Sequence, residues 1–412
     1  MKTAGIIAEY NPFHGGHARH LAATRAAGYT HIITALSGCF VQRGEPAVLG
    51  KTARTRAALL CGADLVLELP SAYSLSSAKR FALAGTGLLA DTGVADGLSF
   101  GSECGDLETL RRTARCIESP ELQPKLKQFL QAGKSFAAAR QAAAEAVFGT
   151  GTAEILASPN NLLAAEYLAA LDTLGVKMEA FTVKREGAPH GGGFQCGFET
   201  QLCGGINHSG LALSASQIRS LLLSGKEFAD ILPALEASVP ADALVTLKDE
   251  FPNIYSQKDF ETAALSRLRA LPRETFEALT DVREGLGSRL FESARRACSL
   301  TELYRFAKSK RFTHSRIRRA IMRAAIGMEE GLPEKVPYIR VLGFNGRGQE
   351  LLAAMRKRAH VPCVTRGTQA RSLGGDIAKV FAAECAAADL IALAVPGRKV
   401  CGEEFRFNPV RV

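Results

Sequence analysis

The sequence predicts an α/β protein whose N-terminal part is a doubly wound parallel sheet. Over residues 3–100, short apolar runs alternate with helical patterns, as they do in βαβ units. A turn with glycines and two histidines follows the first apolar run, as expected where a Rossmann-like sheet binds an anion. With 412 residues, the chain exceeds the usual size of one hydrophobic core, so we expect two or three domains.

Each element of this sheet domain follows from a local pattern. Apolar runs predict strands over 3–9, 30–36, 65–69 and 97–100, with helices between them over 16–27, 51–61 and 78–89. Next come helical insertions over 107–116 and 122–148, a helix over 160–174, an extended run over 177–185, a glycine-rich link over 192–210 and a helix over 216–223. We expect this domain to span residues 1–225, with the loops 8–17, 37–44, 100–106 and 185–193 facing one crevice.

The chain then changes character twice. Residues 226–330 have helical periodicity and are locally basic. Beyond residue 336, apolar runs over 338–344, 361–364 and 390–395 predict strands beside alanine-rich helices. We therefore expect a helical region over 226–330 and a small mixed α/β part over 331–412.

The composition excludes several classes of protein. Hydrophobic residues make up 47% and charged residues 22%, and no apolar run approaches the roughly 20 residues of a membrane helix. The first nine residues are too short for a secretory signal, so we expect a cytoplasmic chain that starts at Met1 and has no membrane partner. The ten cysteines form no C-x-x-C pair, which favours reduced, mostly buried thiols over a structural metal.

The charge indicates a polyanionic partner. The formal net charge is +10, and residues 305–323 lack acidic side chains while aromatic residues are interleaved among the basic ones. Such a mixture suits a folded RNA whose unpaired bases can be splayed out. The residues of this stretch that we expect to contact RNA are Lys308, Lys310, Arg311, Arg316, Arg318 and Arg319.

The strongest chemical signal is the H-x-G-H motif of His14 and His17, directly after the first predicted strand. A glycine at a helix start lets the backbone approach a phosphate, and the free N–H groups and the helix dipole attract the anion. Two imidazoles at this spacing can reach the phosphate from one side and stabilise charge while the α-phosphorus is attacked. We expect both histidines to be catalytic, whereas His20 is explained equally well by a structural role.

A second motif, Ser-Gly-Cys-Phe-Val-Gln-Arg-Gly-Glu-Pro-Ala over 37–47, ends the second strand and precedes a helix that begins near Lys51. The spacing from Gly44 to Gly50 and Lys51 resembles a P-loop, but five residues separate the glycines where that motif has four. Lys51 is therefore expected to meet phosphate or RNA as an isolated charge.

Further loops carry groups suited to a nucleotide. Gly101 ends a strand and permits close approach of a base or ribose. Asn160 and Asn161 open a helix, where one amide can cap it and the other can contact a ligand. Arg185 ends an extended run, where it could clamp a phosphate. The segment 214–219, Ser-Ala-Ser-Gln-Ile-Arg, could hold a triphosphate, but helix capping explains it as well.

Together, six segments closely resemble the bacterial tRNA(Met) cytidine acetate ligase family, and the match runs over nearly the whole chain. They are the stretch 7–20, the motif over 37–47, Phe-Gly-Ser-Glu over 100–103, Ser-Pro-Asn-Asn-Leu-Leu over 158–163, Lys-Arg-Glu-Gly-Ala over 184–188 and Pro-Tyr-Ile-Arg-Val-Leu-Gly over 337–343. The sequence departs from many members after residue 188, where Pro-His-Gly-Gly stands in place of Tyr-His-Asp.

The resemblance implies a nucleotidyltransferase-type Rossmann domain followed by an RNA-binding helical region. It implies a ligase that activates acetate with ATP as acetyl-adenylate and then acetylates N4 of the wobble cytidine in elongator tRNA(Met). For such a reaction we expect Mg²⁺ across the phosphates of ATP. The implied ATP-site residues are Ile7, Ala8, Glu9, Tyr10, Asn11, Pro12, Phe13, His14, Gly15, Gly16, His17, Ala18, Arg19, His20, Gly101, Asn160, Asn161 and Arg185.

Two alternatives remain open from the sequence. The first is a small-molecule adenylyltransferase of cofactor biosynthesis, which would share the H-x-G-H turn but would have little use for a basic helical region. The second is a nucleotide-sensing RNA-binding protein that performs no catalysis.

Overall fold

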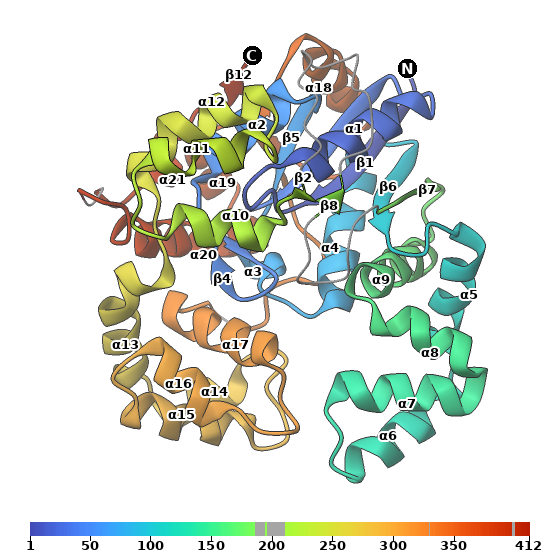
Figure 1. The fold of residues 1–412 in the computed structure, drawn as a ribbon, viewed down its shortest axis with the longest axis vertical. Coiled ribbons are helices and arrows are strands. Elements are labelled where there is room, and N and C mark those ends of the chain that lie inside the picture. The colour runs from blue at the N-terminus through green and yellow to red at the C-terminus, as the bar shows by residue number, and fades with distance from the viewer. Residues whose placement is uncertain (186–193, 196–210, 329, 398–399) are drawn as a thin grey trace.

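The structure is a computed structural model that describes residues 1–185, 194–195, 211–328, 330–397 and 400–412. Its centre is an eight-stranded sheet with the order β11-β10-β5-β2-β1-β6-β7, in which β12 pairs with β10 (Figure 1). The strands are β1 (Thr3–Ala8), β2 (His31–Ser37), β5 (Leu65–Leu69), β6 (Gly97–Ser102), β7 (Glu179–Lys184), β10 (Ile339–Phe344), β11 (Cys363–Val364) and β12 (Val410–Arg411).

The five N-terminal strands are parallel, as predicted. β1 pairs in parallel with β2 and β6, β2 pairs with β5, and β6 pairs with β7. Every residue of β2 and β5 is buried, which is typical of strands covered on both faces. The prediction of a doubly wound α/β fold is therefore confirmed.

Helices cover both faces of this sheet. On one face, Ile6, Ile32 and Val66 share a core with α1 (Gly15–Ala26), α2 (Lys51–Leu60), α10 (Ala215–Leu222), α11 (Phe228–Glu236) and α12 (Ala241–Glu250). On the other face, Ile33 and Leu67 share a core with α3 (Ser71–Ser74), α4 (Ala78–Ala90), α9 (Pro159–Leu174), α18 (Gly346–Arg358) and α20 (Gly375–Ala392). Helices α11 and α12 thus belong to the sheet core, although we expected that domain to end near Gly225.

The C-terminal segment is part of the same sheet. Strand β10 pairs antiparallel with β5, with Val341 opposite Leu67. Residues 331–412 therefore do not form a separate domain. They also contain α19 (Gly367–Ser372) and α21 (Glu403–Arg406). Pairing with β10 removes the exposed edge that β5 would otherwise present. The strand predicted over 390–395 is wrong, because α20 continues to Ala392 and a turn follows.

Two helical lobes extend from the sheet (Figure 1). One is the insertion of α5 (Leu107–Glu118), α6 (Leu122–Gln131), α7 (Phe136–Phe148) and α8 (Thr150–Ala157). The other contains the short turns η1 (Phe251–Asn253) and η2 (Gln257–Phe260), then α13 (Glu261–Ala270), α14 (Arg273–Ala278), α15 (Leu286–Arg296), α16 (Leu300–Ala307) and α17 (His314–Ile326). Two small antiparallel pairs complete the fold, β3 (Phe40–Val41) with β4 (Glu45–Pro46) and β8 (Phe194–Gln195) with β9 (Leu211–Ala212).

Two expectations from composition can be compared with the described part of the chain. None of its helices has both the length and the apolar character needed to cross a bilayer. Free thiols there include Cys298, Cys363 and Cys401, which are exposed, so the expectation of mostly buried cysteines holds for only some of them.

Candidate active site

The site loops meet at one edge of the sheet. Strands β2, β1, β6 and β7 are neighbours and parallel, so the loops that follow them emerge on the same side. The H-x-G-H turn follows β1, the motif over 37–47 follows β2, Gly101 lies near the end of β6, and Arg185 follows β7. The remainder of the last predicted loop, residues 186–193, and the departure from the family pattern after residue 188 lie outside the described residues.

Buried side chains hold the H-x-G-H turn in place. Tyr10 and Phe13 are each 2% exposed and belong to the same core as Leu21. The side chain of Asn11 is also buried, and its Oδ1 accepts the backbone N–H of Val48 at 2.8 Å. These residues of the predicted ATP segment thus fix the course of the backbone from β1 to α1.

The two histidines of the motif form a capping pair at the start of α1. Nδ1 of His14 accepts the backbone N–H of Gly16 at 3.0 Å, and Nδ1 of His17 accepts the backbone N–H of His14 at 3.2 Å. The ring centroids lie 3.9 Å apart. Because a backbone N–H can only donate, both Nδ1 atoms accept, and each neutral ring carries its proton on Nε2.

The surroundings keep these imidazoles neutral. Burial lowers the pKa of His14 to about 3, and the positive charges of Arg185 and Arg19 act in the same direction. Burial and the neighbouring His14 hold the pKa of His17 well below its usual range. The turn therefore presents neutral Nε2–H donors next to positively charged arginines, an arrangement suited to a polyphosphate.

Two arginines, Arg185 and Arg219, approach this turn from other parts of the chain. Arg185 lies over Gly101, where an added Cβ would come within 3.3 Å of its Cγ, and its backbone N–H donates to the carbonyl of Ser102 at 2.8 Å. Arg219 of α10 donates from Nη1 to the carbonyl of Asn11 at 2.7 Å. The sequence indicated Arg219 only through the loose segment over 214–219; its place beside the turn depends on α10 packing against the sheet.

The two asparagines that open α9 are engaged with Glu103. The carboxylate of Glu103 accepts the Nδ2–H of Asn160 at 2.7 Å and the backbone N–H of Asn161 at 2.7 Å. Oδ1 of Asn161 accepts the backbone N–H groups of Glu103 and Cys104 at 2.8 and 3.0 Å. Asn161 is buried, with 3% of its surface exposed. The contacts of both asparagines with Glu103 and Cys104 join the start of α9 to the loop after β6.

His20 has the structural partner that we considered for it. Its Nε2 lies 2.9 Å from Oγ of Ser99 on β6, and the same hydroxyl lies 2.7 Å from Oγ1 of Thr24. Burial lowers the pKa of His20 to about 4, so this ring is neutral as well. The contact fixes α1 against the sheet.

Most of the basic residues expected to contact RNA make contacts within the chain. Lys308 donates to the carbonyls of Ser309 and Phe312, Arg316 to that of Asp281 and Arg319 to that of Gln42, while Arg318 forms an ion pair with Glu45. Lys310 and Arg311 are exposed. The basic stretch over 305–323 is thus only partly an exposed surface.

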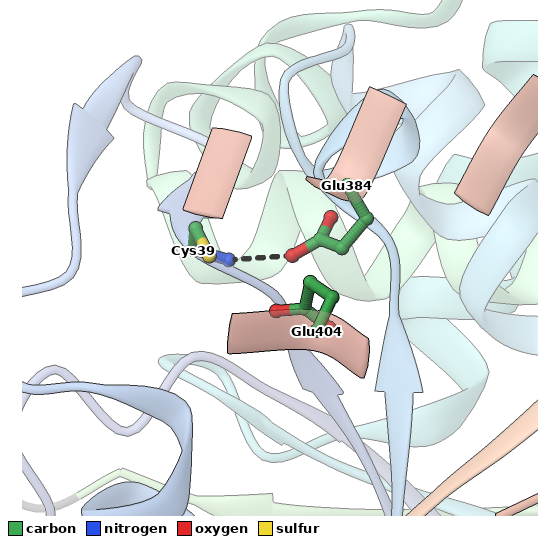
Figure 2. Close-up of side chains that lie close together, drawn as sticks. All are labelled: Cys39, Glu384 and Glu404. Carbon is green, nitrogen blue, oxygen red and sulfur yellow. Dashed lines mark hydrogen bonds between the residues drawn. The ribbon is translucent and has the colours of Figure 1, made fainter. Parts of the chain in front are cut away.

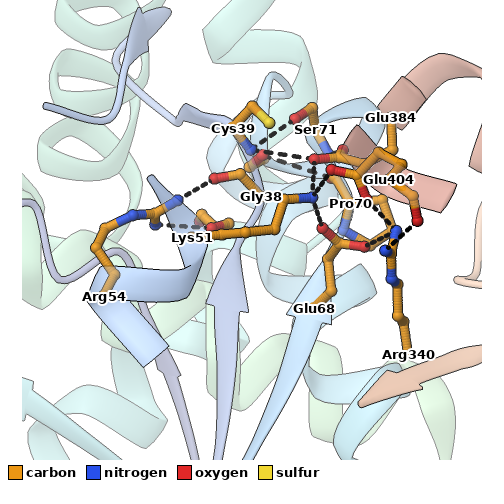
Figure 3. A network of polar contacts seen from close by, with 12 residues as sticks. Gly38, Cys39, Lys51, Arg54, Glu68, Pro70, Ser71, Arg340, Glu384 and Glu404 are labelled. Carbon is orange, nitrogen blue, oxygen red and sulfur yellow. Dashed lines mark hydrogen bonds and ion pairs between the residues drawn. The ribbon is translucent and has the colours of Figure 1, made fainter. Parts of the chain in front are cut away.

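Lys51 is not on the surface at all, and the expectation that it contacts RNA is wrong. Its side chain is 6% exposed, and its Nζ pairs with Glu68, with Glu384 at 3.0 Å and with Glu404 at 2.6 Å (Figure 3). Burial works against its charge, but these carboxylates hold the pKa of Lys51 well above its usual range. Two of the partners come from the C-terminal segment, which the local pattern around Lys51 cannot reveal.

Cys39, Glu384 and Glu404 lie close enough together to suggest a metal site (Figure 2). The ammonium group of Lys51 already pairs with both of these carboxylates, and Arg340 pairs with Glu404. Burial also holds the pKa of the Cys39 thiol well above its usual range, which disfavours the thiolate that a metal requires. The cluster is therefore a buried ion network.

The sequence relatives identify the family. A tRNA(Met) cytidine acetate ligase of Thermoanaerobacter sp. strain X514 is 35% identical over 98% of this chain and 98% of its own length. This chain belongs to the tRNA(Met) cytidine acetate ligase family. A second tRNA(Met) cytidine acetate ligase, from Fervidobacterium nodosum, is 36% identical over 90% of this chain and 86% of its own. The profile of the HIGH Nucleotidyl Transferase family also matches, over residues 1–404.

The fold agrees with a solved structure of a tRNA(Met) cytidine acetate ligase family member. The crystal structure of Thermotoga maritima TmcAL bound with alpha-thio ATP matches with a TM-score of 0.87 and 29% identity over the full length of both chains. The apo form of the same protein gives the same TM-score at 30% identity. The expected nucleotidyltransferase-type fold is confirmed for this chain.

Proposed function

We propose that this chain is an ATP-dependent ligase that activates acetate as acetyl-adenylate and acetylates N4 of the wobble cytidine of elongator tRNA(Met). The names of its relatives and the ATP analogue bound by the Thermotoga protein support this proposal. The observation that carries it is the pair of Nε2–H groups that His14 and His17 present at the start of α1, beside Arg185 and Arg219. With a tRNA substrate, we expect the enzyme to act in the cytoplasm.

In the first step, a carboxylate oxygen of acetate attacks the α-phosphorus of ATP and pyrophosphate leaves. The imidazole Nε2–H groups and the arginines stabilise the negative charge that develops on the phosphate oxygens. No proton has to be transferred, since the nucleophile is already an anion. The neutral state of the rings suits this task, because each acts as a fixed hydrogen-bond donor.

In the second step, the N4 amine of the cytidine attacks the carbonyl carbon of the mixed anhydride, AMP leaves, and one N4 proton is released to water. This amine is a weak nucleophile, so the rate depends chiefly on how well the reactants are positioned. Good orientation can lower the activation barrier by up to about 7–11 kcal/mol. The cytidine has to leave its stack to reach the anhydride. Lys310 and Arg311 are exposed in the loop between α16 and α17. We assign these two residues to contacts with the tRNA backbone.

Mg²⁺ would neutralise the charge of the triphosphate. In the described site loops, the carboxylate of Glu9 accepts the backbone N–H of Gln42 at 2.8 Å, and that of Glu103 is bonded to Asn160 and Asn161. Burial raises the pKa of Glu9, which further weakens it as a metal ligand. The ion would therefore be held by phosphate oxygens and water, with the arginines binding the remaining oxygens.

The decisive experiment is mass spectrometry of elongator tRNA(Met) after incubation with the enzyme, ATP and isotopically labelled acetate. We expect the label on one cytidine, together with AMP and pyrophosphate. Pyrophosphate exchange that proceeds only with another acid, and without any labelled tRNA, would instead indicate the small-molecule adenylyltransferase. ATP and tRNA binding without exchange would indicate the nucleotide-sensing protein.

A further inference from the structure

Residues 37–49, here called the bridging segment, contain the motif after β2 to which the proposed chemistry gives no task. The segment includes the β3–β4 hairpin and ends just before α2. It lies between the H-x-G-H turn on one side and two elements distant in sequence, α17 and α20, on the other. Each of these three neighbours makes polar contacts with it.

The bridging segment is bonded directly to the turn. The backbone N–H of Gln42 donates to Oε1 of Glu9 at 2.8 Å, and that of Val48 donates to Oδ1 of Asn11 at 2.8 Å. Arg54, which is 1% exposed, joins the same two segments through the carbonyls of Glu9 and Ser37 at 3.0 and 2.8 Å. The backbone that leads into His14 is therefore fixed by residues of the bridging segment.

Helix α17 holds the bridging segment from the other side. Nη1 of Arg319 donates to the carbonyl of Gln42 at 3.2 Å, and Arg318 pairs with Glu45. Gly44 has a φ of +78°, and a Cβ there would lie 2.5 Å from the backbone nitrogen of Arg319. The hairpin thus packs against the helix backbone at a position where only glycine fits.

Helix α20 holds the start of the bridging segment (Figure 3). Oε1 of Glu384 accepts the backbone N–H of Cys39 at 3.1 Å, and its Oε2 accepts that of Ser71 at 2.6 Å. A Cβ on Gly38 would overlap with Oε1 of Glu384, so this carboxylate is packed against the strand end. Glu384 therefore ties together the residues that follow β2 and β5.

We propose that Arg319 is a positioning residue for adenylate formation, which it supports by holding Gln42 and, through Gln42, Glu9 and the H-x-G-H turn. This inference rests on the proposed function and assigns Arg319 to the ATP half-reaction, whereas its place in a basic stretch suggested RNA contact. The chain of contacts runs from the guanidinium of Arg319 through both backbone polar groups of Gln42 to the carboxylate of Glu9. The α13–α17 lobe, which carries the exposed Lys310 and Arg311, is thereby linked to the H-x-G-H turn.

The test is acetate-dependent exchange of pyrophosphate into ATP in the absence of tRNA, measured with the full-length chain. For Arg319→Ala we expect a fall in kcat/KM for ATP of about tenfold, chiefly through KM, as for the loss of one hydrogen bond from a charged donor. Affinity for tRNA, measured without ATP, should stay within about twofold. Arg319→Lys keeps a charged donor and should recover part of the loss.

Arg323→Ala is the matched control. Arg323 lies one turn further along α17, is 2% exposed and also donates to a backbone carbonyl, that of Ala72 at 2.9 Å. Its other polar partners, Thr280 and Glu330, also lie outside the bridging segment. Its exchange rate per folded molecule should match that of the wild type. An equal loss in Arg323→Ala and Arg319→Ala would overturn the proposal, because it would show a general effect on the fold.

Two further outcomes separate this inference from the proposed function. Exchange by Arg319→Ala within about twofold of the wild type, combined with weaker tRNA binding, would assign Arg319 to RNA and overturn the inference alone. A wild-type protein with no acetate-dependent exchange would overturn the proposed function itself. If Arg319→Ala does not fold, Gly44→Ala displaces the hairpin from the same helix, and unchanged exchange by that folded variant would also contradict the inference.

Discussion

His17 accepts the backbone N–H of His14 through its Nδ1 at 3.2 Å, and the two rings lie with their centroids 3.9 Å apart. This contact fixes both the orientation and the tautomer of His17. Because Nδ1 accepts a hydrogen bond within the turn, the proton lies on Nε2, which is left to donate. The glycine two residues after His14 makes this geometry possible, because a Cβ on Gly16 would lie 2.8 Å from Cε1 of His14. Capping and the proposed catalytic role therefore use different nitrogens of the same rings.

The separation of these two roles can be tested with His17→Asn. An asparagine keeps a short acceptor that can bond to the backbone N–H of His14, but it removes the Nε2 donor. We expect a stable protein whose acetate-dependent pyrophosphate exchange falls by about a hundredfold or more, as when one donor to a developing anion is removed. Thermal unfolding serves as the control, and exchange at the wild-type rate would leave the turn with a binding role only.

The neutral histidines predict a loss of stability in acid. The pKa values of His14 and His20 are lowered to about 3 and about 4, against an ordinary value of 6.5, so below pH 6.5 the unfolded chain binds protons that the folded chain does not. Each such group lowers the free energy of unfolding by about 1.4 kcal/mol per pH unit as the pH falls from 6.5 towards its folded pKa. His20→Gln should flatten this dependence in urea unfolding at pH 5–7, and an unchanged slope would show that folding does not lower the pKa of His20.

The buried ion network predicts a large effect of Lys51→Ala on stability. This change leaves Arg340 paired with Glu68 and Glu404 but deprives Glu384 of its ammonium partner, and removing one partner of a buried pair typically costs about 3–5 kcal/mol. Urea unfolding measures the loss. Arg56→Ala, on the exposed side of the same helix, is the control and should change stability by less than about 0.5 kcal/mol. Weaker tRNA binding at unchanged stability would restore RNA contact as the role of Lys51.

Protonation of Glu68 changes the net charge of the buried ion network, because Glu68 pairs with both Lys51 and Arg340. Burial raises the pKa of Glu68 to about 7, although Lys51 and Arg340 act against this shift. For Glu384, Lys51 and the N–H of Ser71 outweigh burial and lower the pKa to about 2. Protonation of Glu68 would leave two cations facing two carboxylates, which balances the charges of the network.

The exposed residues Lys310 and Arg311, in the loop between α16 and α17, predict how tRNA binding depends on salt. Replacing both Lys310 and Arg311 by Ala should weaken tRNA binding at low salt. It should also reduce the slope of log K against log salt by about one unit for each phosphate that the variant no longer neutralises. Acetate-dependent exchange without tRNA shows whether the ATP site is intact in this variant. An unchanged salt slope would place the tRNA on another face of the molecule.

The sequence predicts much of the site because its signals are local. The strand before the H-x-G-H turn, the glycines at the helix start and the spacing of the two imidazoles lie within one short stretch, and their geometry follows from hydrogen bonds between near neighbours. The order of parallel strands then brings Gly101 and Arg185 to the same edge. Sequence reasoning fails where an apolar run suits either a buried strand or a buried helix, as over 390–395.

The sequence by itself determined the α/β class, the position of the H-x-G-H turn after the first strand and the family. The tertiary structure alone decided which charges are available to a ligand. Lys51 and Arg319 both look like surface cations in the sequence, but Lys51 pairs with Glu384, which is 333 residues away, and Arg319 bonds to Gln42, which is 277 residues away. The physical reason is that a charged side chain can bind a ligand only if it is exposed and not already paired. Its burial and its partners are set by contacts between elements distant along the chain.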